Sequence, residues 1–83
     1  MLDKVTDFPQ YRKLSNNKVY YRIRNDRNFD EIQIIGSKAQ LFTIEAQQYP
    51  EILRIQDLLN LSMEGFEHST SVEFDQLLDH YSL

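Results

Sequence analysis

Three runs rich in β-branched and aromatic residues, each bounded by turn-forming residues, constrain the fold of this chain more than any other feature. The runs cover residues 19–24, 29–35 and 39–46, with breaks at 25–28 and at Gly36 and Ser37. Such runs are typical of strands, and short polar breaks between them are typical of hairpins. The sequence therefore predicts an antiparallel meander. A shorter run over 11–14 adds a first strand, which turns at Asn16 and Asn17 into the next one.

The register of this meander follows from the requirement that its apolar side chains share one buried face. A four-residue loop over 25–28 places Arg22 opposite Glu31. A three-residue loop over 36–38 then puts the apolar residues of the last strand on the same face. The predicted core face consists of Val19, Tyr21, Ile23, Ile32, Ile34, Phe42, Ile44 and Ala46, with Leu14 at its edge.

Two helices are expected after the sheet. Pro50 suits the first turn of a helix, and Glu51 places a negative charge at its positive end. An apolar stripe at helical spacing continues from there to about Leu61. Thr70 and Glu73 have the spacing of a capping box, which predicts that a second helix begins at this point.

Length and the order of these elements set the fold class. Eighty-three residues with 41% hydrophobic content can build one core. We therefore expect one small α+β domain over residues 1–83, with a three- or four-stranded antiparallel β-meander followed by two α-helices packed on one face of the sheet. Residues 62–69, between the two helices, are expected to form a loop.

The sequence offers little that could carry catalysis or hold a metal. It contains no cysteine, and its two histidines, His68 and His80, match neither the spacing of zinc ligands nor that of a hydrolytic triad. Its two glycines do not form a phosphate-binding loop. We therefore expect a protein that is not an enzyme and needs no cofactor or metal. The lack of cysteine, of an apolar leader and of a membrane-length apolar run predicts a cytoplasmic protein without a membrane partner.

A basic and aromatic surface on the first strands is the strongest candidate for binding. The candidate binding residues, which share the face opposite the predicted core, are Tyr11, Lys13, Tyr20, Arg22 and Arg24. Such a surface suits an acidic protein partner. It also suits single-stranded nucleic acid, whose bases stack on rings while its phosphates meet arginines. The sequence pI of about 5.0 makes nucleic acid the less favoured partner.

A small apolar patch is expected on the same face, near the hairpin at Gly36. Ile35 and Leu41 form it together with Ala39. Either the N-terminal segment or a second copy of the chain could cover this patch. The N-terminal segment would use Leu2, Val5 and Phe8. A second copy would make Ile35 and Leu41 the residues of self-association.

The two halves of the chain carry opposite net charge. Residues 1–44 contain eight Lys and Arg against five Asp and Glu, whereas residues 45–83 contain Arg54 alone against eight acids. The acidic side of the last helix could pair with the basic strands within one chain or between two chains. The expected function is a non-catalytic, small cytoplasmic protein-interaction module able to self-associate. Single-stranded nucleic-acid binding is the alternative.

Overall fold

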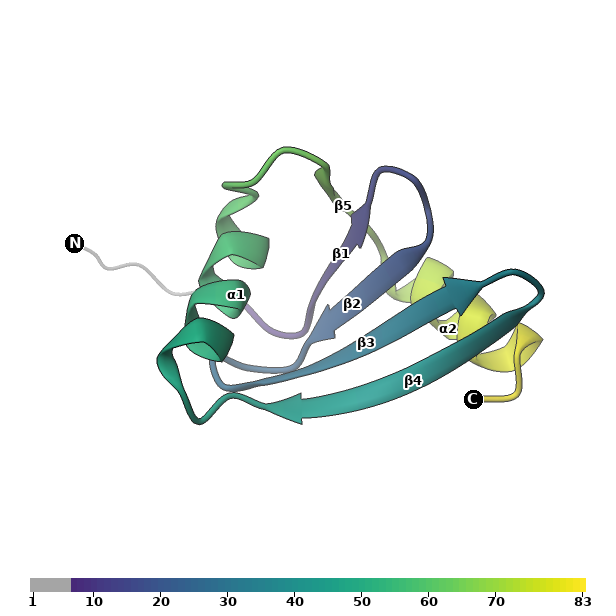
Figure 1. Ribbon diagram of the computed structural model, residues 1–83, viewed down its shortest axis with the longest axis horizontal. Coiled ribbons are helices and arrows are strands. Elements are labelled where there is room, and N and C mark those ends of the chain that lie inside the picture. Colours follow the sequence, from purple (N-terminus) through teal and green to yellow (C-terminus); the bar gives the residue numbers. More distant parts are fainter. Residues whose placement is uncertain (1–6) are drawn as a thin grey trace.

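A five-stranded antiparallel sheet lies at the centre of the computed structural model, which describes residues 7–83 (Figure 1). The elements in chain order are β1 (Gln10–Leu14), β2 (Val19–Ile23), β3 (Asn28–Ile35), β4 (Lys38–Glu45), α1 (Tyr49–Asn60), β5 (Phe66–His68) and α2 (Ser71–His80). The strands lie side by side in the order β4-β3-β2-β1-β5. The predicted α+β class and antiparallel sheet are confirmed, with five strands rather than three or four.

The additional strand is β5, which lies inside the stretch 62–69 where the sequence predicts a loop. It pairs with the outer edge of β1, and Leu14 lies opposite Phe66. A run of three residues is too short to show the alternating pattern that predicts a strand. This strand forms because β1, from a distant part of the chain, supplies its hydrogen-bond partners. Phe66 packs against the core on the side of α1.

The two helices pack on opposite faces of the sheet, although the sequence predicts both on one face (Figure 1). The cluster under α1 consists of Tyr21, Ile23, Phe29, Ala46, Ile55 and Leu58, and the cluster under α2 consists of Tyr20, Ile32 and Phe74. Tyr20 and Tyr21 are neighbours in one strand and therefore point to opposite faces. We call these the α1 face and the α2 face. The apolar stripe of each helix predicts that the helix packs against the sheet, but it does not predict which face of the sheet the helix covers.

The hairpin between β2 and β3 is one residue shorter than predicted. The amide of Arg24 donates to the carbonyl oxygen of Asn28 at 2.9 Å, which leaves three residues in the loop. The side-chain oxygen of Asn25 accepts from the amide of Arg27 at 2.8 Å. An asparagine that bonds to the backbone two residues on stabilises a tight turn, and this accounts for the shorter loop.

The shorter loop shifts the register of β3 by one residue. Arg22 lies opposite Asp30, whereas the prediction placed it opposite Glu31. A shift of one residue moves every side chain of a strand to the other face. Ile32 and Ile34, predicted on one core face with Tyr21 and Ile23, instead pack on the α2 face.

The hairpin between β3 and β4 has a two-residue loop, Gly36 and Ser37, in place of the predicted three residues. Ile35 pairs directly with Lys38, and Gly36 has a φ of +62°. Glycine adopts this positive φ without strain, and the first central residue of a type II′ hairpin turn requires it. The three-residue prediction rested on a single buried face. Because the sheet is buried on both faces, the apolar residues of β3 and β4 need not share one face.

The predicted starts of both helices are confirmed. Pro50 lies in the first turn of α1, and Glu51 completes a capping box there. The Thr70 hydroxyl accepts from the amide of Glu73 at 3.1 Å and caps α2. Local sequence chemistry is sufficient at these positions because a cap joins residues only three apart.

Arg12 belongs to the basic run of the early strands, yet its side chain is buried against the end of α1. Its guanidinium donates to the carbonyl oxygens of Leu58 at 2.8 Å and Leu59 at 3.1 Å. The last carbonyls of a helix lack partners within the helix and form its negative end. Burial lowers the pKa of Arg12, while these carbonyls stabilise its positive charge. Arg12 thus fixes β1 to the carboxyl end of α1.

Candidate interaction surfaces

The side chains predicted to form a binding surface lie on one face of the sheet, where α2 covers most of them and leaves Arg24 exposed. Tyr11 and Lys13 come from β1, Tyr20 and Arg22 from β2, and Arg24 from the turn that follows. Tyr11 lies opposite Arg22, as the sequence predicts. Tyr20 is only 8% exposed, and burial raises the pKa of its hydroxyl. This group of residues is therefore largely an internal contact between the sheet and α2.

Phe74 of α2 makes the central contact with this group. Its buried ring lies with its centroid 5.8 Å from that of Tyr11. The guanidinium of Arg22 lies 4.7 Å from the centroid of the same ring, a cation–π contact. Phe74 thus takes the place on the sheet that a stacked base would need.

The two arginines of the group share one buried carboxylate. Asp30 of β3 accepts a hydrogen bond from Nε of Arg22 at 2.9 Å, and Nε of Arg24 forms an ion pair with the same oxygen at 3.2 Å. The hydroxyl of Thr43 donates to its other oxygen at 3.0 Å. Charge-assisted bonds of this kind satisfy a carboxylate that has lost its water. The arginines therefore have a partner within the sheet.

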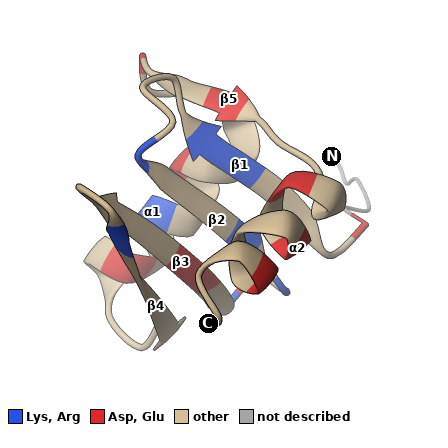
Figure 2. Cartoon of the chain, turned by 90° about the vertical axis from the view of Figure 1, so that its right-hand side faces the viewer, with Lys and Arg blue, Asp and Glu red and all other residues tan. Residues whose placement is uncertain are grey.

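The acidic side of α2 pairs with a basic strand within the chain. Nζ of Lys13 lies 3.3 Å from a carboxylate oxygen of Glu73, and Figure 2 shows α2 lying over the sheet beside β1. The hydroxyl of Ser69 donates to the other oxygen of Glu73 at 2.6 Å. Of the two arrangements that the charge pattern allows, the intrachain one is observed for this pair.

Glu73 is expected to make the stability of the protein depend on pH. The hydrogen bond from Ser69, followed by that from Lys13, lowers the pKa of Glu73 below its ordinary value of 4.5. A carboxyl group with a lowered pKa contributes stability above its unfolded pKa and loses it as the pH falls through the folded pKa. Thermal unfolding from pH 6 to pH 3 should show a lower Tm for Glu73→Gln at pH 6 and a vanishing difference near pH 3. Asp75→Asn on the same helix is the control, and an equal Tm deficit at every pH would contradict the prediction.

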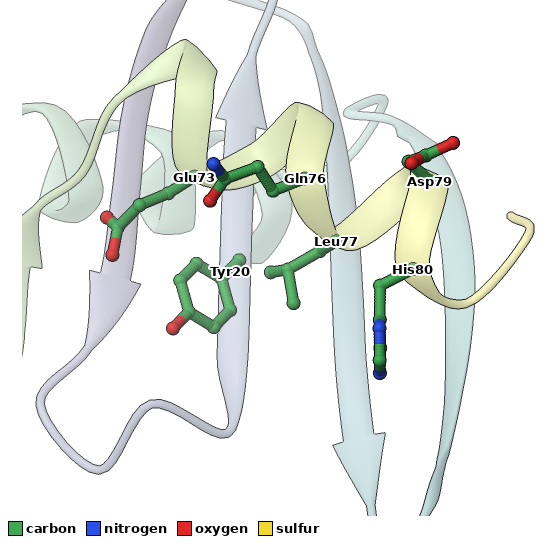
Figure 3. Close-up of a pocket in the computed structure, with 6 residues that line it drawn as sticks. All are labelled: Tyr20, Glu73, Gln76, Leu77, Asp79 and His80. Atoms are coloured by element: carbon green, nitrogen blue, oxygen red, sulfur yellow. The ribbon is translucent and has the colours of Figure 1, made fainter.

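A hollow of about 530 Å³ lies between α2 and β2 (Figure 3). Its lining comprises Tyr20, Glu73, Gln76, Leu77, Asp79 and His80. Glu73 is already bonded to Lys13 and Ser69. Figure 3 shows Asp79 pointing away from Tyr20 and His80. These titratable groups therefore do not converge on a common point, as general acid–base catalysis would require.

The far end of the β3–β4 hairpin lies beyond the region that α1 covers (Figure 1). On the α1 face of this hairpin Ile35 is 68% exposed and Phe42 is 40% exposed. A hollow of about 350 Å³ lies beside Ile35 and is lined by Gln33, Ile35, Lys38, Ala39 and Gln40. This end of the sheet is an exposed surface with large apolar side chains.

The predicted patch of Ile35 and Leu41 is wrong in its geometry. Leu41 lies opposite Ile32 and therefore on the α2 face. Ile35 is three residues from Ile32 along β3 and so points to the α1 face. A three-residue loop that included Lys38 would place Ile35 and Leu41 on one face, whereas the observed two-residue loop places them on opposite faces. Phe42, predicted in the core, is the other large apolar side chain of this hairpin that is exposed on the α1 face, four ladder positions from Ile35.

The N-terminal segment was one candidate to cover this patch. Of its apolar residues, Leu2 and Val5 lie outside the described residues 7–83. Phe8 packs against the cluster on the α1 face.

Within residues 7–83, no helix is long and apolar enough to cross a membrane, and no group of three or more potential metal-ligating side chains is present. Comparison with protein-family models, curated proteins and solved structures found no match to this chain.

Proposed function

We propose that this chain is a non-catalytic protein-interaction module that associates with a second copy of itself through the exposed end of the β3–β4 hairpin. One observation carries the proposal, namely the exposure of Ile35 and Phe42 on the α1 face beyond α1. The two side chains lie four ladder positions apart on this face, with Gln33 and Gln40 between them. Exposed large apolar side chains on one face are typical of interaction sites. Nucleic-acid binding has weaker support, because Tyr20 is buried and Arg22 is paired with Asp30.

The size of the protein also favours self-association. A chain of 83 residues has a limited core, and here the buried residues are divided between two faces of one sheet. Domains of this size commonly gain stability from oligomerisation. A second copy that covers the exposed hairpin would bury apolar side chains that are exposed in the single chain.

Light scattering should test this proposal at low and high salt. We expect the wild-type protein to have the mass of a dimer that persists at high salt, because an apolar contact is not screened. Ile35→Asp should lower the mass to that of a monomer. An aspartate at the contact would have to lose its hydration.

Val72→Asp is the matched control, because Val72 is an exposed apolar residue on α2. This variant should retain the dimer mass. A wild-type protein that is monomeric at all concentrations and salt conditions would contradict the proposed function.

A further inference from the structure

We propose that the outer edge of β4 pairs antiparallel with the same edge of a second copy, with the two-fold axis at Phe42. The two sheets would then form one continuous sheet of ten strands. This inference rests on the proposed function and names the contact by which the two copies meet. It follows from the backbone of β4, from its charges and from its side chains.

The backbone groups available for pairing can be identified from the ladder between β3 and β4. The amide of Ala46 donates to the carbonyl oxygen of Arg27 on the extension of β3. Hydrogen-bonded residues alternate along an antiparallel strand. The amide and carbonyl groups of even-numbered β4 residues therefore face β3. Those of Ala39, Leu41, Thr43 and Glu45 face outward, and the strand order places no further strand there among the described residues.

The two edges of the sheet differ in a way that points to β4. The edge strand β5 has three residues, of which Glu67 carries a charge. Short, charged edge strands are protected against pairing. By contrast, β4 has eight residues, and the six between Lys38 and Glu45 carry no charge and include no proline. An edge of this length and composition is a ready template for another strand, and a folded protein avoids aggregation by covering it.

The charges of β4 favour a second copy in antiparallel orientation. Lys38 begins the strand and Glu45 ends it. Antiparallel pairing brings the positive end of one strand near the negative end of the other, twice by symmetry, with Lys38 on the α1 face and Glu45 on the α2 face. Parallel pairing would bring like charges together, which destabilises neighbouring strands. β4 is therefore complementary to itself in one orientation.

The position of the axis follows from the side chains and the outward-facing groups. A two-fold axis that is perpendicular to the sheet and passes beside one residue of β4 pairs odd-numbered residues with odd-numbered residues. The outward-facing residues, which are odd-numbered, then lie opposite one another. With the axis at Phe42, Ala39 lies opposite Glu45 of the second copy and Leu41 lies opposite Thr43, so all four outward-facing residues are bonded. With the axis at Leu41, Glu45 would lie opposite Ser37 in the turn. The axis at Phe42 also brings the two exposed phenylalanine rings together at a non-hydrogen-bonded pair, where side chains approach most closely.

The same symmetry explains why Ile35 contributes to association although it lies on β3. The axis keeps the α1 faces of both copies on one side of the joined sheet. The end of β4 in one copy, followed by α1, then lies beside the start of β4 in the other. The exposed Tyr49 at the beginning of α1 therefore comes to the same end and face as Ile35 of the second copy.

Single cysteines provide a direct test, because the natural chain contains none. Phe42→Cys places two thiols across the axis, where a Cα separation of about 4.5 Å in a non-hydrogen-bonded pair permits a disulfide. With an added oxidant, this variant should form a covalent dimer in high yield. Gln40→Cys is the matched control, because its two copies would lie several residues apart, and it should remain uncrosslinked.

A second pair of variants tests the backbone contact without removing the aromatic ring. Leu41→Pro deletes one outward-facing amide and leaves the ladder with β3 intact, since proline is tolerated at the open side of an edge strand. Light scattering should give a monomer for Leu41→Pro and a dimer for Leu41→Ala. Circular dichroism and thermal unfolding establish that both variants are folded.

The outcomes separate the edge pairing from the proposed function. A wild-type monomer would overturn both. A wild-type dimer in which Leu41→Cys crosslinks and Phe42→Cys does not would overturn the axis at Phe42. A wild-type dimer that Leu41→Pro leaves intact would overturn the pairing of β4 edges and leave self-association through another surface.

Discussion

Replacing Phe74 with alanine is expected to lower the free energy of unfolding by about 3–5 kcal/mol, the range for a buried phenylalanine. Phe74 is the side chain of α2 that is buried in the α2-face cluster with Tyr20 and Ile32. Its loss removes the ring contact with Tyr11 and leaves the guanidinium of Arg22 without its aromatic partner. Chemical denaturation followed by circular dichroism measures the change.

Val72→Ala is the control for this variant, because Val72 lies on the same helix with its side chain exposed. It should change the free energy of unfolding by less than about 0.5 kcal/mol. Quenching of tyrosine fluorescence by acrylamide should increase in Phe74→Ala, since Tyr20 gains access to solvent. A stability loss below about 1 kcal/mol would mean that α2 is not held by this ring.

Replacing Arg12 with methionine is expected to lower the free energy of unfolding by about 3 kcal/mol. Methionine retains much of the apolar stem but donates no hydrogen bond. The carbonyl oxygens of Leu58 and Leu59 would lose the bonds that end α1. The carbonyl of Leu58 keeps a bond from the amide of Leu61 at 3.3 Å, whereas that of Leu59 loses its side-chain donor. An unsatisfied buried carbonyl costs about 1–3 kcal/mol, and the loss of the charge-assisted bond to Leu58 adds to this cost. Chemical denaturation again measures the effect.

Two further variants separate the bonds of Arg12 from its charge. Arg12→Lys keeps a positive charge near the helix end but lacks the planar fork, so an intermediate loss is expected. Arg27→Met, in an exposed loop, is the control for removing an arginine. Equal losses for Arg12→Met and Arg27→Met would show that the cap contributes nothing measurable to stability.

The register errors of the sequence analysis share one physical cause. The prediction assumed a sheet with one buried face, and each hairpin loop was chosen to collect apolar residues there. In the structure Ile32 contributes to one face and Ile23 to the other. Alternation along a strand gives the relative orientation of its side chains, but only the packing of both helices decides which faces are buried.

For the candidate binding residues, the shared face could be predicted from the sequence but the exposure could not. Alternation and the turn at Asn17 were enough to place Tyr11, Tyr20 and Arg22 on one face, as the β1–β2 register confirms. Their exposure could not be predicted, because it depends on α2, which lies about 50 residues further along the chain. The signal that could have indicated burial was the apolar side of α2 itself, with Phe74 at its centre.

The sequence by itself determined the first four strands, the first hairpin and the starts of both helices, because strand composition, turn residues and caps act between residues close in the chain. Only the tertiary structure decided the places of α1 and α2 on opposite faces, the pairing of β5, and the role of Arg12 at the end of α1. These features join residues far apart in the chain, as Tyr21 and Ile55 are under α1 and as Arg12 and Leu58 are at its end. Contacts of that kind depend on which surfaces the folded chain brings together, and no local pattern encodes them.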